Sequence, residues 1–363
     1  YKRQIALHAV PLEEPGDLDH SHRGFLRDDD NGKMDGFGRP HGIADVPYAY
    51  VPRDETKPIW TLAQRYTFGD RMFQTNEGPS FPAHLYIVSG TSAPDATSPL
   101  LASENPGDPE RDQPNGGCDS PQDMLVALID QAGNEQHHEY PCFDAQTIMD
   151  LLDAKHVSWK YYEPHIGGLW DGPDAYKHIR QSQTDWPRVI VPETTILSDI
   201  TAGKLASVSW VIPNGRNSDH PGTRSDTGPS WVASIVNAVG GSDYWKSTAI
   251  FVTWDDWGGW YDHVVPPNYN SYELGFRVPL IVVSPYAKRG YVSHQQHEFG
   301  SILKFVEENW GLGSLGRTDV RADDLADCFD FSLTPDAYVQ VATKYSTAYF
   351  EETKVAFSPP DDE

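Results

Sequence analysis

Short apolar runs that end abruptly in polar residues are the clearest pattern along the chain. These runs are rich in β-branched and aromatic residues, which is typical of strands buried on both faces. They lie at residues 157–162, 206–212, 249–254 and 278–284. We predict that each run forms a strand of one buried sheet.

Helical periodicity separates these runs. The stretch 145–155 follows Asp144, a candidate N-cap, and places its apolar residues on one face, as do residues 230–239 and 301–308. Alternating strands and helices indicate a parallel sheet with helices on both faces. With 29 Pro and 30 Gly scattered along the chain, long loops join these elements. We therefore predict an α/β fold, a three-layer α/β/α sandwich with a mainly parallel central sheet, in a single domain over residues 1–363.

Charge and composition exclude several classes of protein. The formal net charge of −25 would repel a phosphate backbone, so a nucleic-acid-binding protein is excluded and partners should be neutral, cationic or bridged by metal. No apolar run reaches the roughly 18 residues of a transmembrane segment. The acidity, 11 Trp, 18 Tyr and only 3 Cys favour a secreted, periplasmic or cell-surface protein, although a cytosolic chain can show the same numbers.

The three cysteines are Cys118, Cys142 and Cys328. The first two lie in segments rich in Gly, Pro and Asp, where a disulfide can staple two loops. We predict a Cys118–Cys142 disulfide, with Cys328 either free or paired to a segment outside this sequence.

Ligands of α/β sheets bind beyond the carboxyl ends of the strands, and one such end is unusually acidic. Asp255 and Asp256 follow the run 249–254 and precede two glycines, which allow a ligand or another backbone to come close. Paired carboxylates suit a hard divalent cation, which lowers the pKa of a bound nucleophile and polarises a phosphoryl oxygen. The alternative is a strand end capped by acidic residues, and the two readings are about equally supported.

Ser80 lies in the segment GPSFPAH, just before an apolar stretch that can be helical. A serine at a helix start can be a nucleophile, since the positive end of the helix favours an anionic oxygen. Most serines in such a position are only caps. By itself, this position favours a cap.

Histidines are numerous, at 14 in the chain, and several lie in polar clusters. An imidazole can protonate a leaving oxygen or donate to a phosphate near neutral pH. The candidates are His20, His178, His220 and His263, although each one alone is more often a surface histidine. The sequence has no zinc motif, P-loop, GxGxxG or GxSxG, so nucleotide cofactors and common esterase chemistry lack support.

Read together, several segments carry a resemblance to a known family. They are DLDHSHRGF with NGKMDGF, then FGDRMFQTNEGPSFPAHLYIVSGTS, SWVIPNGRNSDHPG, GPSWVASIVNAVG, AIFVTWDDWGGWYDHV and GFRVPLIVVSPYAKRGYVSH. In this order they resemble the phosphoesterase family of bacterial phospholipases C and related acid phosphatases, within the alkaline phosphatase superfamily. The resemblance runs from about residue 17 to 330 and implies an alkaline-phosphatase-like fold.

The resemblance also implies roles. Ser80 falls on the family's metal-bound nucleophile, which forms a covalent phosphoryl intermediate, and Asp255 and Asp256 fall on paired acidic ligands of one divalent metal ion. His20 and His220 fall on histidines that hold phosphate oxygens or assist the leaving group.

His178 and His263 are weaker candidates for substrate binding. Family members also begin with an apolar strand that ends in a Glu-Asn pair of metal ligands, and this sequence contains no such strand before His20. We expect a separate or cleaved N-terminal segment to supply it.

The expected function is metal-dependent hydrolysis of phosphate esters through a phosphoserine, as in an acid phosphatase or phosphodiesterase. Two alternatives stay open: a phospholipase C acting on phosphocholine-type headgroups, and a catalytically silent surface or structural protein that keeps the fold. The expected partner is a small phosphate ester or a phospholipid headgroup.

Overall fold

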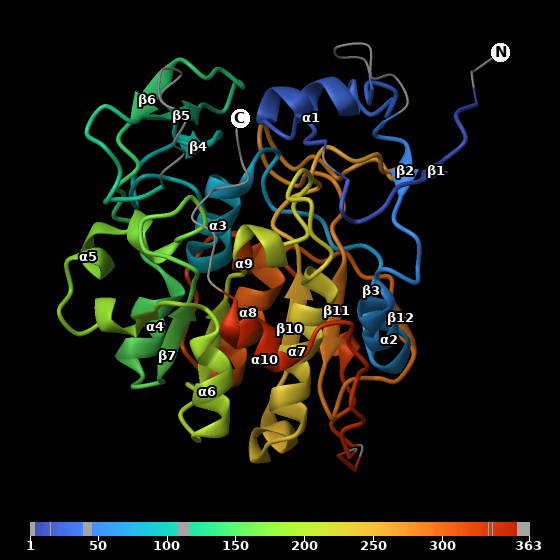
Figure 1. Cartoon of the computed structure of the whole chain (residues 1–363). Coiled ribbons are helices and arrows are strands. Elements are labelled where there is room, and N and C mark those ends of the chain that lie inside the picture. The colour runs from blue at the N-terminus through green and yellow to red at the C-terminus, as the bar shows by residue number, and fades with distance from the viewer. Residues whose placement is uncertain are drawn as a thin grey trace.

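The computed structural model describes residues 4–14, 16–38, 46–107, 116–332, 334–335 and 337–353 (Figure 1). Its strands are β1 (His8–Ala9), β2 (Ala49–Tyr50), β3 (Thr67–Gly69), β4 (Leu101–Ala102), β5 (Val126–Ile129), β6 (His137–Glu139), β7 (Trp159–Tyr162), β8 (Val189–Ile190), β9 (Val208–Val211), β10 (Ile250–Thr253), β11 (Leu280–Val283) and β12 (Tyr291–Ser293). Its helices are α1 (His22–Asp29), α2 (Lys57–Arg65), α3 (Ser80–Ser89), α4 (Ile148–Ala154), α5 (Lys177–Arg180), α6 (Thr195–Thr201), α7 (Gly228–Gly240), α8 (Phe299–Trp310), α9 (Thr318–Arg321) and α10 (Thr347–Glu352). Every strand and helix predicted from the apolar pattern is present. Among the described residues, no helix is long and apolar enough to cross a membrane.

The central strands form two sheets. One has the order β10-β11-β3-β12 and the other β8-β7-β9. Pairing is parallel within the second sheet and between β3 and β12, whereas β11 is antiparallel to both β10 and β3. The reversal at β11 has a local cause: no helix lies between β10 and β11 to carry the chain back for a parallel pairing. The predicted α/β class is confirmed, but the strands predicted to share one mainly parallel sheet lie in two sheets, and strand directions are mixed in the sheet that contains β11.

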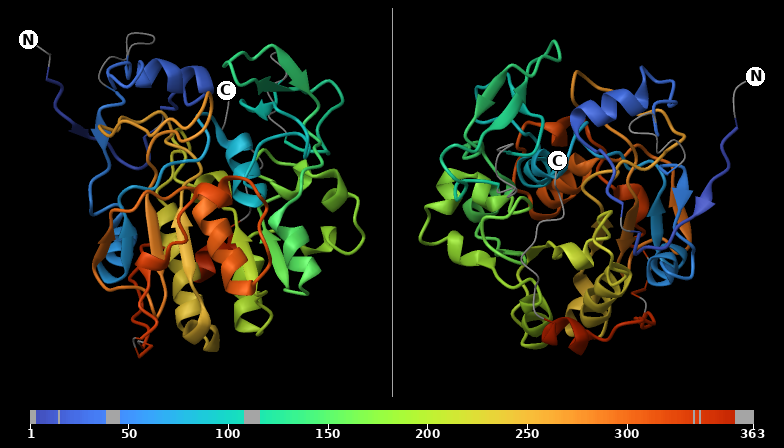
Figure 2. Two further views of the ribbon diagram at one scale, coloured as in Figure 1. Left: turned by 180° about the vertical axis from the view of Figure 1, so that it is seen from behind. Right: turned by 45° about the horizontal axis from the view of Figure 1, so that its top comes forward.

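Helices cover both faces of these strands. On β10, Ile250 packs in one apolar cluster with α7 residues such as Val236, while the next residue, Phe251, contacts Phe305 of α8 with ring centroids 5.0 Å apart. Because neighbouring side chains of a strand point to opposite faces, α7 and α8 lie on opposite sides of the sheet. The two sides can be compared in Figure 1 and, from behind, in Figure 2. This is the predicted three-layer arrangement.

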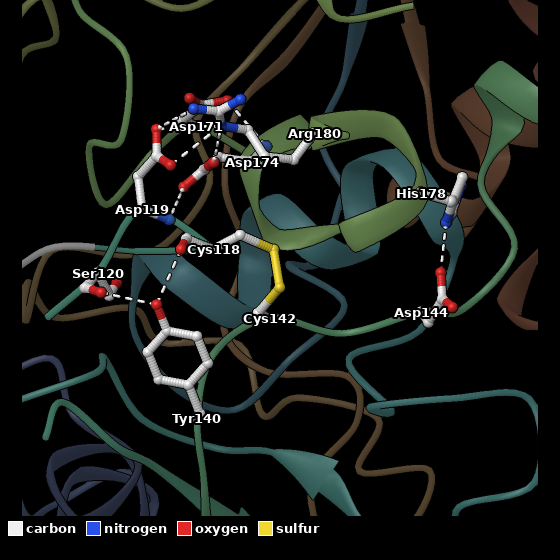
Figure 3. Close-up of a disulfide and its surroundings, with 10 residues drawn as sticks. All are labelled: Cys118, Asp119, Ser120, Tyr140, Cys142, Asp144, Asp171, Asp174, His178 and Arg180. Carbon is white, nitrogen blue, oxygen red and sulfur yellow. Dashed lines mark hydrogen bonds and ion pairs between the residues drawn. A yellow bond between two sulfur atoms is a disulfide. The ribbon is translucent and has the colours of Figure 1, made fainter. Parts of the chain in front are cut away.

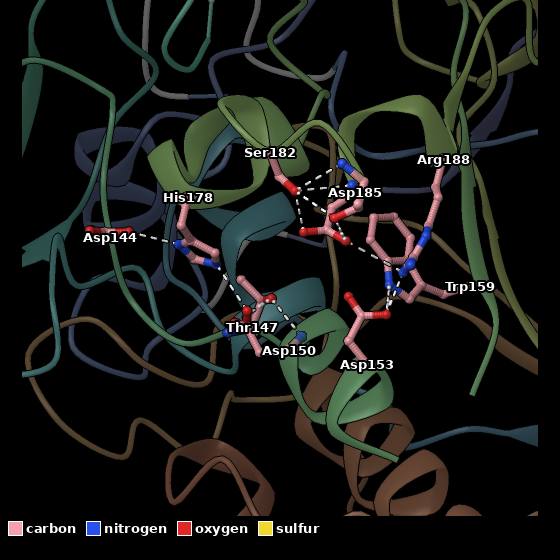
Figure 4. A network of polar contacts seen from close by, with 10 residues as sticks. Asp144, Thr147, Asp150, Asp153, Trp159, His178, Ser182, Asp185 and Arg188 are labelled. Carbon is pink, nitrogen blue, oxygen red and sulfur yellow. Dashed lines mark hydrogen bonds and ion pairs between the residues drawn. The ribbon is translucent and has the colours of Figure 1, made fainter. Parts of the chain in front are cut away.

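Helix α4 begins one turn later than Asp144 would place it. Its N-cap is Thr147, whose side chain accepts from the backbone N–H of Asp150 while the Asp150 carboxylate accepts from the Thr147 backbone in return (Figure 4). The prediction of Asp144 as the cap is wrong, because the capping box satisfies both backbone donors. Asp144 instead accepts a hydrogen bond from His178 at 2.7 Å.

The predicted disulfide between Cys118 and Cys142 is present, with Cα atoms 4.4 Å apart (Figure 3). The Tyr140 hydroxyl lies beside it, within 2.8 Å of the Cys118 carbonyl oxygen and 2.6 Å of that of Ser120. Cys328 is buried and unpaired in the described structure. The bridge ties the loop before β5 to the segment that leads into α4.

Candidate active site

Ser80 is the first residue of α3, and Pro79 occupies the cap position. The Ser80 hydroxyl donates a hydrogen bond to Oδ2 of Asp256 at 3.2 Å, and the side chain is fully buried. The serine oxygen therefore lies at the positive end of a 10-residue helix, where a developing negative charge is stabilised. Ser80 and the acidic pair after β10 are brought together, as predicted.

Asp255 and Asp256 come directly after β10, and a glycine turn fixes them. The backbone N–H of Gly258 donates to Oδ1 of Asp256 at 2.7 Å. Gly259 has φ +74°, and a Cβ there would lie 2.4 Å from Cβ of Leu18. A larger residue is excluded, so the two glycines let the acidic turn pack against the loop that precedes His20.

His84 is a site residue that the sequence analysis did not single out. Its Nε2 lies 3.5 Å from Oδ2 of Asp255, and its ring stacks on Trp170 at 6.4 Å between centroids. Its Nδ1–H donates to the Tyr161 hydroxyl at 3.3 Å, since that hydroxyl's own proton goes to the Trp170 carbonyl. Ser80 and His84 are four residues apart on one helix, so they share a face. The four-residue spacing of Ser80 and His84 in the segment SFPAH is the sequence feature that could have identified His84 as a site residue.

His20 and His220 also meet, with ring centroids 5.2 Å apart. The Nδ1–H of His20 donates to the Leu18 carbonyl at 2.6 Å, and that of His220 to the Pro221 carbonyl at 2.7 Å. Because a carbonyl can only accept, both rings carry a proton on Nδ1, and Nε2 is the atom that gains or gives up a proton. Ligand atoms of Asp17, His20 and His220 all lie within 4.8 Å of one another. Asp17 is a second residue that the sequence analysis missed.

Asp219 shapes the loop that carries His220. It has φ +63°, and the Trp254 side chain hydrogen bonds to it. Loss of water around the carboxyl raises its pKa to about 7. A Cβ on Gly228 would lie 2.0 Å from Oδ1 of Asp219, so this loop can sit on the start of α7 only because residue 228 is glycine.

The two weaker candidates lie elsewhere. Neither His178 nor His263 is among the residues that line the cavity shared by His220, Asp255 and Asp256. His178 makes ion pairs with Asp144 and Asp150, and chiefly the Asp150 contact raises its pKa to about 9 (Figures 3 and 4). The His263 side chain is 74% exposed and lies 3.6 Å from Asp262.

The donor set around Ser80 fits a divalent cation. Two carboxylates and a serine oxygen are hard oxygen ligands, and Ser80 and Asp256 already converge at 3.2 Å. Asp255 and Asp256 also line a cavity of about 1060 Å³ together with His84, Trp170 and His220. A ligand that enters this cavity meets the acidic pair, the histidines and aromatic rings at once.

Comparison with known proteins identifies the family of this chain. The sequence model of the phosphoesterase family matches residues 5–313. The chain belongs to the phosphoesterase family.

Proteins of similar sequence include bacterial and plant phospholipases C. Phospholipase C B of Mycobacterium tuberculosis is 24% identical over 369 residues, covering 88% of this chain and 65% of that protein. Non-hemolytic phospholipase C of Burkholderia pseudomallei is 27% identical over 342 residues, covering 79% of this chain and 45% of that protein. Non-specific phospholipase C6 of Arabidopsis thaliana is 24% identical, covering 78% and 53%. The chain thus spans about two thirds or less of the length of these relatives.

Solved structures give weaker likenesses. Murine ectonucleotide pyrophosphatase / phosphodiesterase 5 has a TM-score of 0.43 at 9% identity, covering 90% of this chain and all of that one. A protein of the alkaline phosphatase superfamily from Vibrio parahaemolyticus has a TM-score of 0.40 at 12% identity, covering 88% and 71%. Likenesses of this strength support no inference about function.

Proposed function

We propose that this phosphoesterase-family chain hydrolyses phosphate esters through Ser80. The observation that carries the proposal is the hydrogen bond from the Ser80 hydroxyl to Asp256 at the start of α3. It places a nucleophile at a helix N-terminus, beside a carboxylate of the acidic pair, and that pair lines a cavity together with His84 and His220. Family membership supports the reaction class.

The Ser80 hydroxyl gives its proton to Asp256, which accepts its hydrogen bond, while the serine oxygen attacks phosphorus in line with the leaving oxygen and the P–O bond to the alcohol breaks. Nε2 of His20 or His220, when protonated, gives its proton to that oxygen. A water molecule then attacks the phosphoserine and restores the Ser80 hydroxyl. A monoester releases inorganic phosphate, and a diester releases a phosphomonoester.

Asp255, Asp256 and Ser80 are the residues that would hold one divalent metal ion. When bound, the ion lowers the pKa of the serine hydroxyl and neutralises charge on the phosphoryl oxygens. Without positive charge near Ser80, the carboxylates alone would repel a phosphate. We therefore expect hydrolysis to require the ion.

Small or zwitterionic esters are the proposed substrates, since a chain of net charge −25 repels polyanions. A phosphocholine-type headgroup is the second candidate. Trp170, Trp254, Trp257 and Trp260 line the cavity, and aromatic faces attract a quaternary ammonium. The phospholipase C names of the relatives support this candidate. The disulfide supports action outside the cytosol.

The test compares a chromogenic phosphomonoester with a phosphocholine diester, with and without chelator. Ser80→Ala should abolish turnover of both. Ser198→Ala, an exposed serine on α6, is the matched control and should leave turnover unchanged. The preferred ester decides between phosphatase and phospholipase.

Chelation should abolish activity, and metal readdition should restore it. Full activity in Ser80→Ala would refute the nucleophile. An inactive protein that binds no metal at Asp255 would instead favour the silent alternative.

A further inference from the structure

A group of metal-ligating side chains lies outside the candidate active site. Ligand atoms of His297, Asp327 and Cys328 all lie within 4.8 Å of one another, and both His297 and Cys328 are 0% exposed. Asp327 and Cys328 belong to a short 3₁₀ helix, Ala326–Cys328, and His297 lies between β12 and α8. In the sheet, β12 is separated from β10 and its acidic pair by β11 and β3.

The His297 ring is held in the orientation that a metal ligand needs. Its Nδ1–H donates to Oδ1 of Asp323 at 2.7 Å. That carboxylate is fixed in turn by the Ser301 hydroxyl at 2.7 Å and by the backbone N–H of Leu325 at 3.1 Å. A Cβ on Gly69 would lie 3.1 Å from Cδ2 of His297, so the glycine at the end of β3 leaves room for the ring. Metal-bound histidines donate their second N–H to a carboxylate in this way, which leaves Nε2 for the ion.

The contact made by Nε2 needs a donor that the neighbouring serine does not supply. Nε2 of His297 lies 2.8 Å from the hydroxyl oxygen of Ser293, which donates to Oδ2 of Asp327 at 2.6 Å. A hydroxyl has one proton, and this one goes to Asp327. The two contacts therefore require a second positive centre between the imidazole and the carboxylate. A cation that binds Nε2 and Asp327 directly supplies it.

Cys328 decides which class of ion fits this group. Its Sγ lies 3.6 Å from Oδ1 of Asp327. The sequence has 3 Cys, and the other two form the disulfide, so Cys328 is the only thiol of these 363 residues. Sulfur and nitrogen ligands select Zn²⁺ and similar transition ions, whereas Mg²⁺ and Ca²⁺ take oxygen ligands.

We propose that His297, Asp327 and Cys328 bind one Zn²⁺ ion in a structural site, separate from the acidic pair that follows β10. The ion binds Nε2, a carboxylate oxygen and the thiolate, and the thiol proton passes to solvent. Ser293 Oγ, which already lies between two of these ligands, is placed to be the fourth. The ion ties the 3₁₀ helix to the segment that leads from β12 into α8. The proposal does not depend on the reaction proposed above.

Cobalt(II) distinguishes this site from the acidic one, because Co²⁺ bound to a thiolate gives an intense near-ultraviolet charge-transfer band and Co²⁺ bound to oxygen ligands does not. The full chain is treated with chelator, which is then removed, and Co²⁺ is added without any added thiol. The band should appear and saturate at one Co²⁺ per chain. It should remain in Ser80→Ala and Asp256→Asn, which alter only the other site, and excess Zn²⁺ should remove it by displacing the cobalt.

Variants of the ligands test the set. Cys328→Ser should lack the band. His297→Gln should bind Co²⁺ at least about tenfold more weakly, and Asp323→Asn should weaken binding by about 10-fold to 100-fold because it orients the ring. His294→Gln is the matched control, since His294 is 74% exposed and pairs with Asp70, and it should bind as wild type does.

Three results would overturn the proposal. The first is a wild-type chain that shows no charge-transfer band with excess Co²⁺, which would make the group a hydrogen-bond network without an ion. The second is a band whose strength and affinity His297→Gln leaves unchanged. The third is a band that excess Zn²⁺ does not remove. The first and third use the wild-type chain alone, so a variant that fails to fold does not affect them.

Discussion

Glu77 is a buried carboxyl whose ionisation opposes folding. It is 3% exposed, and burial, with Asp29 and Glu273 nearby, raises its pKa from 4.5 to about 9. The folded chain therefore holds a proton that the unfolded chain releases above pH 4.5. The stability that this proton contributes is complete below pH 4.5 and is lost as pH rises toward about 9.

The magnitude follows from the shift. At about 1.4 kcal/mol per pKa unit, raising the pH from about 5 to about 8 costs the wild-type chain up to ~4 kcal/mol through this one group. Glutamine has nearly the same shape and does not ionise. Glu77→Gln should therefore be more stable than wild type near pH 8 and nearly equal to it near pH 5.

Urea unfolding followed by tryptophan fluorescence measures the difference. Wild type, Glu77→Gln and Glu308→Gln are compared at both pH values, since Glu308 is exposed on α8 and serves as the control. The control should follow wild type. If Glu77→Gln shows the same loss from pH 5 to pH 8 as wild type, the assignment of this cost to Glu77 is refuted.

Three more predictions concern the disulfide, an ion pair and a glycine. Replacing Cys118 and Cys142 by alanine should lower the free energy of unfolding by about 3.5 kcal/mol, as expected for a closed loop with a separation of 24 residues; urea unfolding measures it, and the variant should no longer respond to reductant. The pKa of His178 is raised to about 9, so its aspartate pairs stabilise fully below pH 6.5 and are lost as pH rises through 9. Because the side chain is 33% exposed, screening limits this to about 1 kcal/mol, and His178→Gln should lose that amount at low pH only, by the same unfolding assay. Gly228→Ala should cost about 1–3 kcal/mol and reduce turnover, because the new methyl displaces Asp219; melting and hydrolysis rates check both effects, and an unchanged melting temperature would contradict the predicted clash.

The central strands and main helices could be predicted from local sequence. Apolar runs at 206–212 and 249–254 hold one strand each, because burial on both faces requires continuous apolar sequence. The direction of β11 could not be predicted, since it depends on the absence of a helix over the preceding turns. The prediction of Asp144 as the cap of α4 was wrong because Asp144 and Thr147 are both good caps, and Thr147 also forms a capping box with Asp150.

The site was predictable only in part. Ser80 and Asp256 were paired by resemblance, and the structure brings them within hydrogen-bond distance. His84 was missed although it lies four residues after Ser80 on the same helix, because its contact with Asp255 joins residues far apart in sequence. The expected missing strand also came from resemblance alone.

The position of the site across two sheets has a mechanical consequence. Asp256 follows β10 and His220 follows β9. The residues of the site are therefore carried by two sheets that no described strand joins. A small separation of the two sheets moves the nucleophile away from the proton donor while each sheet keeps its own strand pairing. Turnover should therefore fail at urea concentrations below those at which tryptophan fluorescence reports unfolding. A bound phosphate analogue that contacts residues of both sheets should hold them together. The urea concentration at which turnover is lost should then approach the concentration at which tryptophan fluorescence reports unfolding.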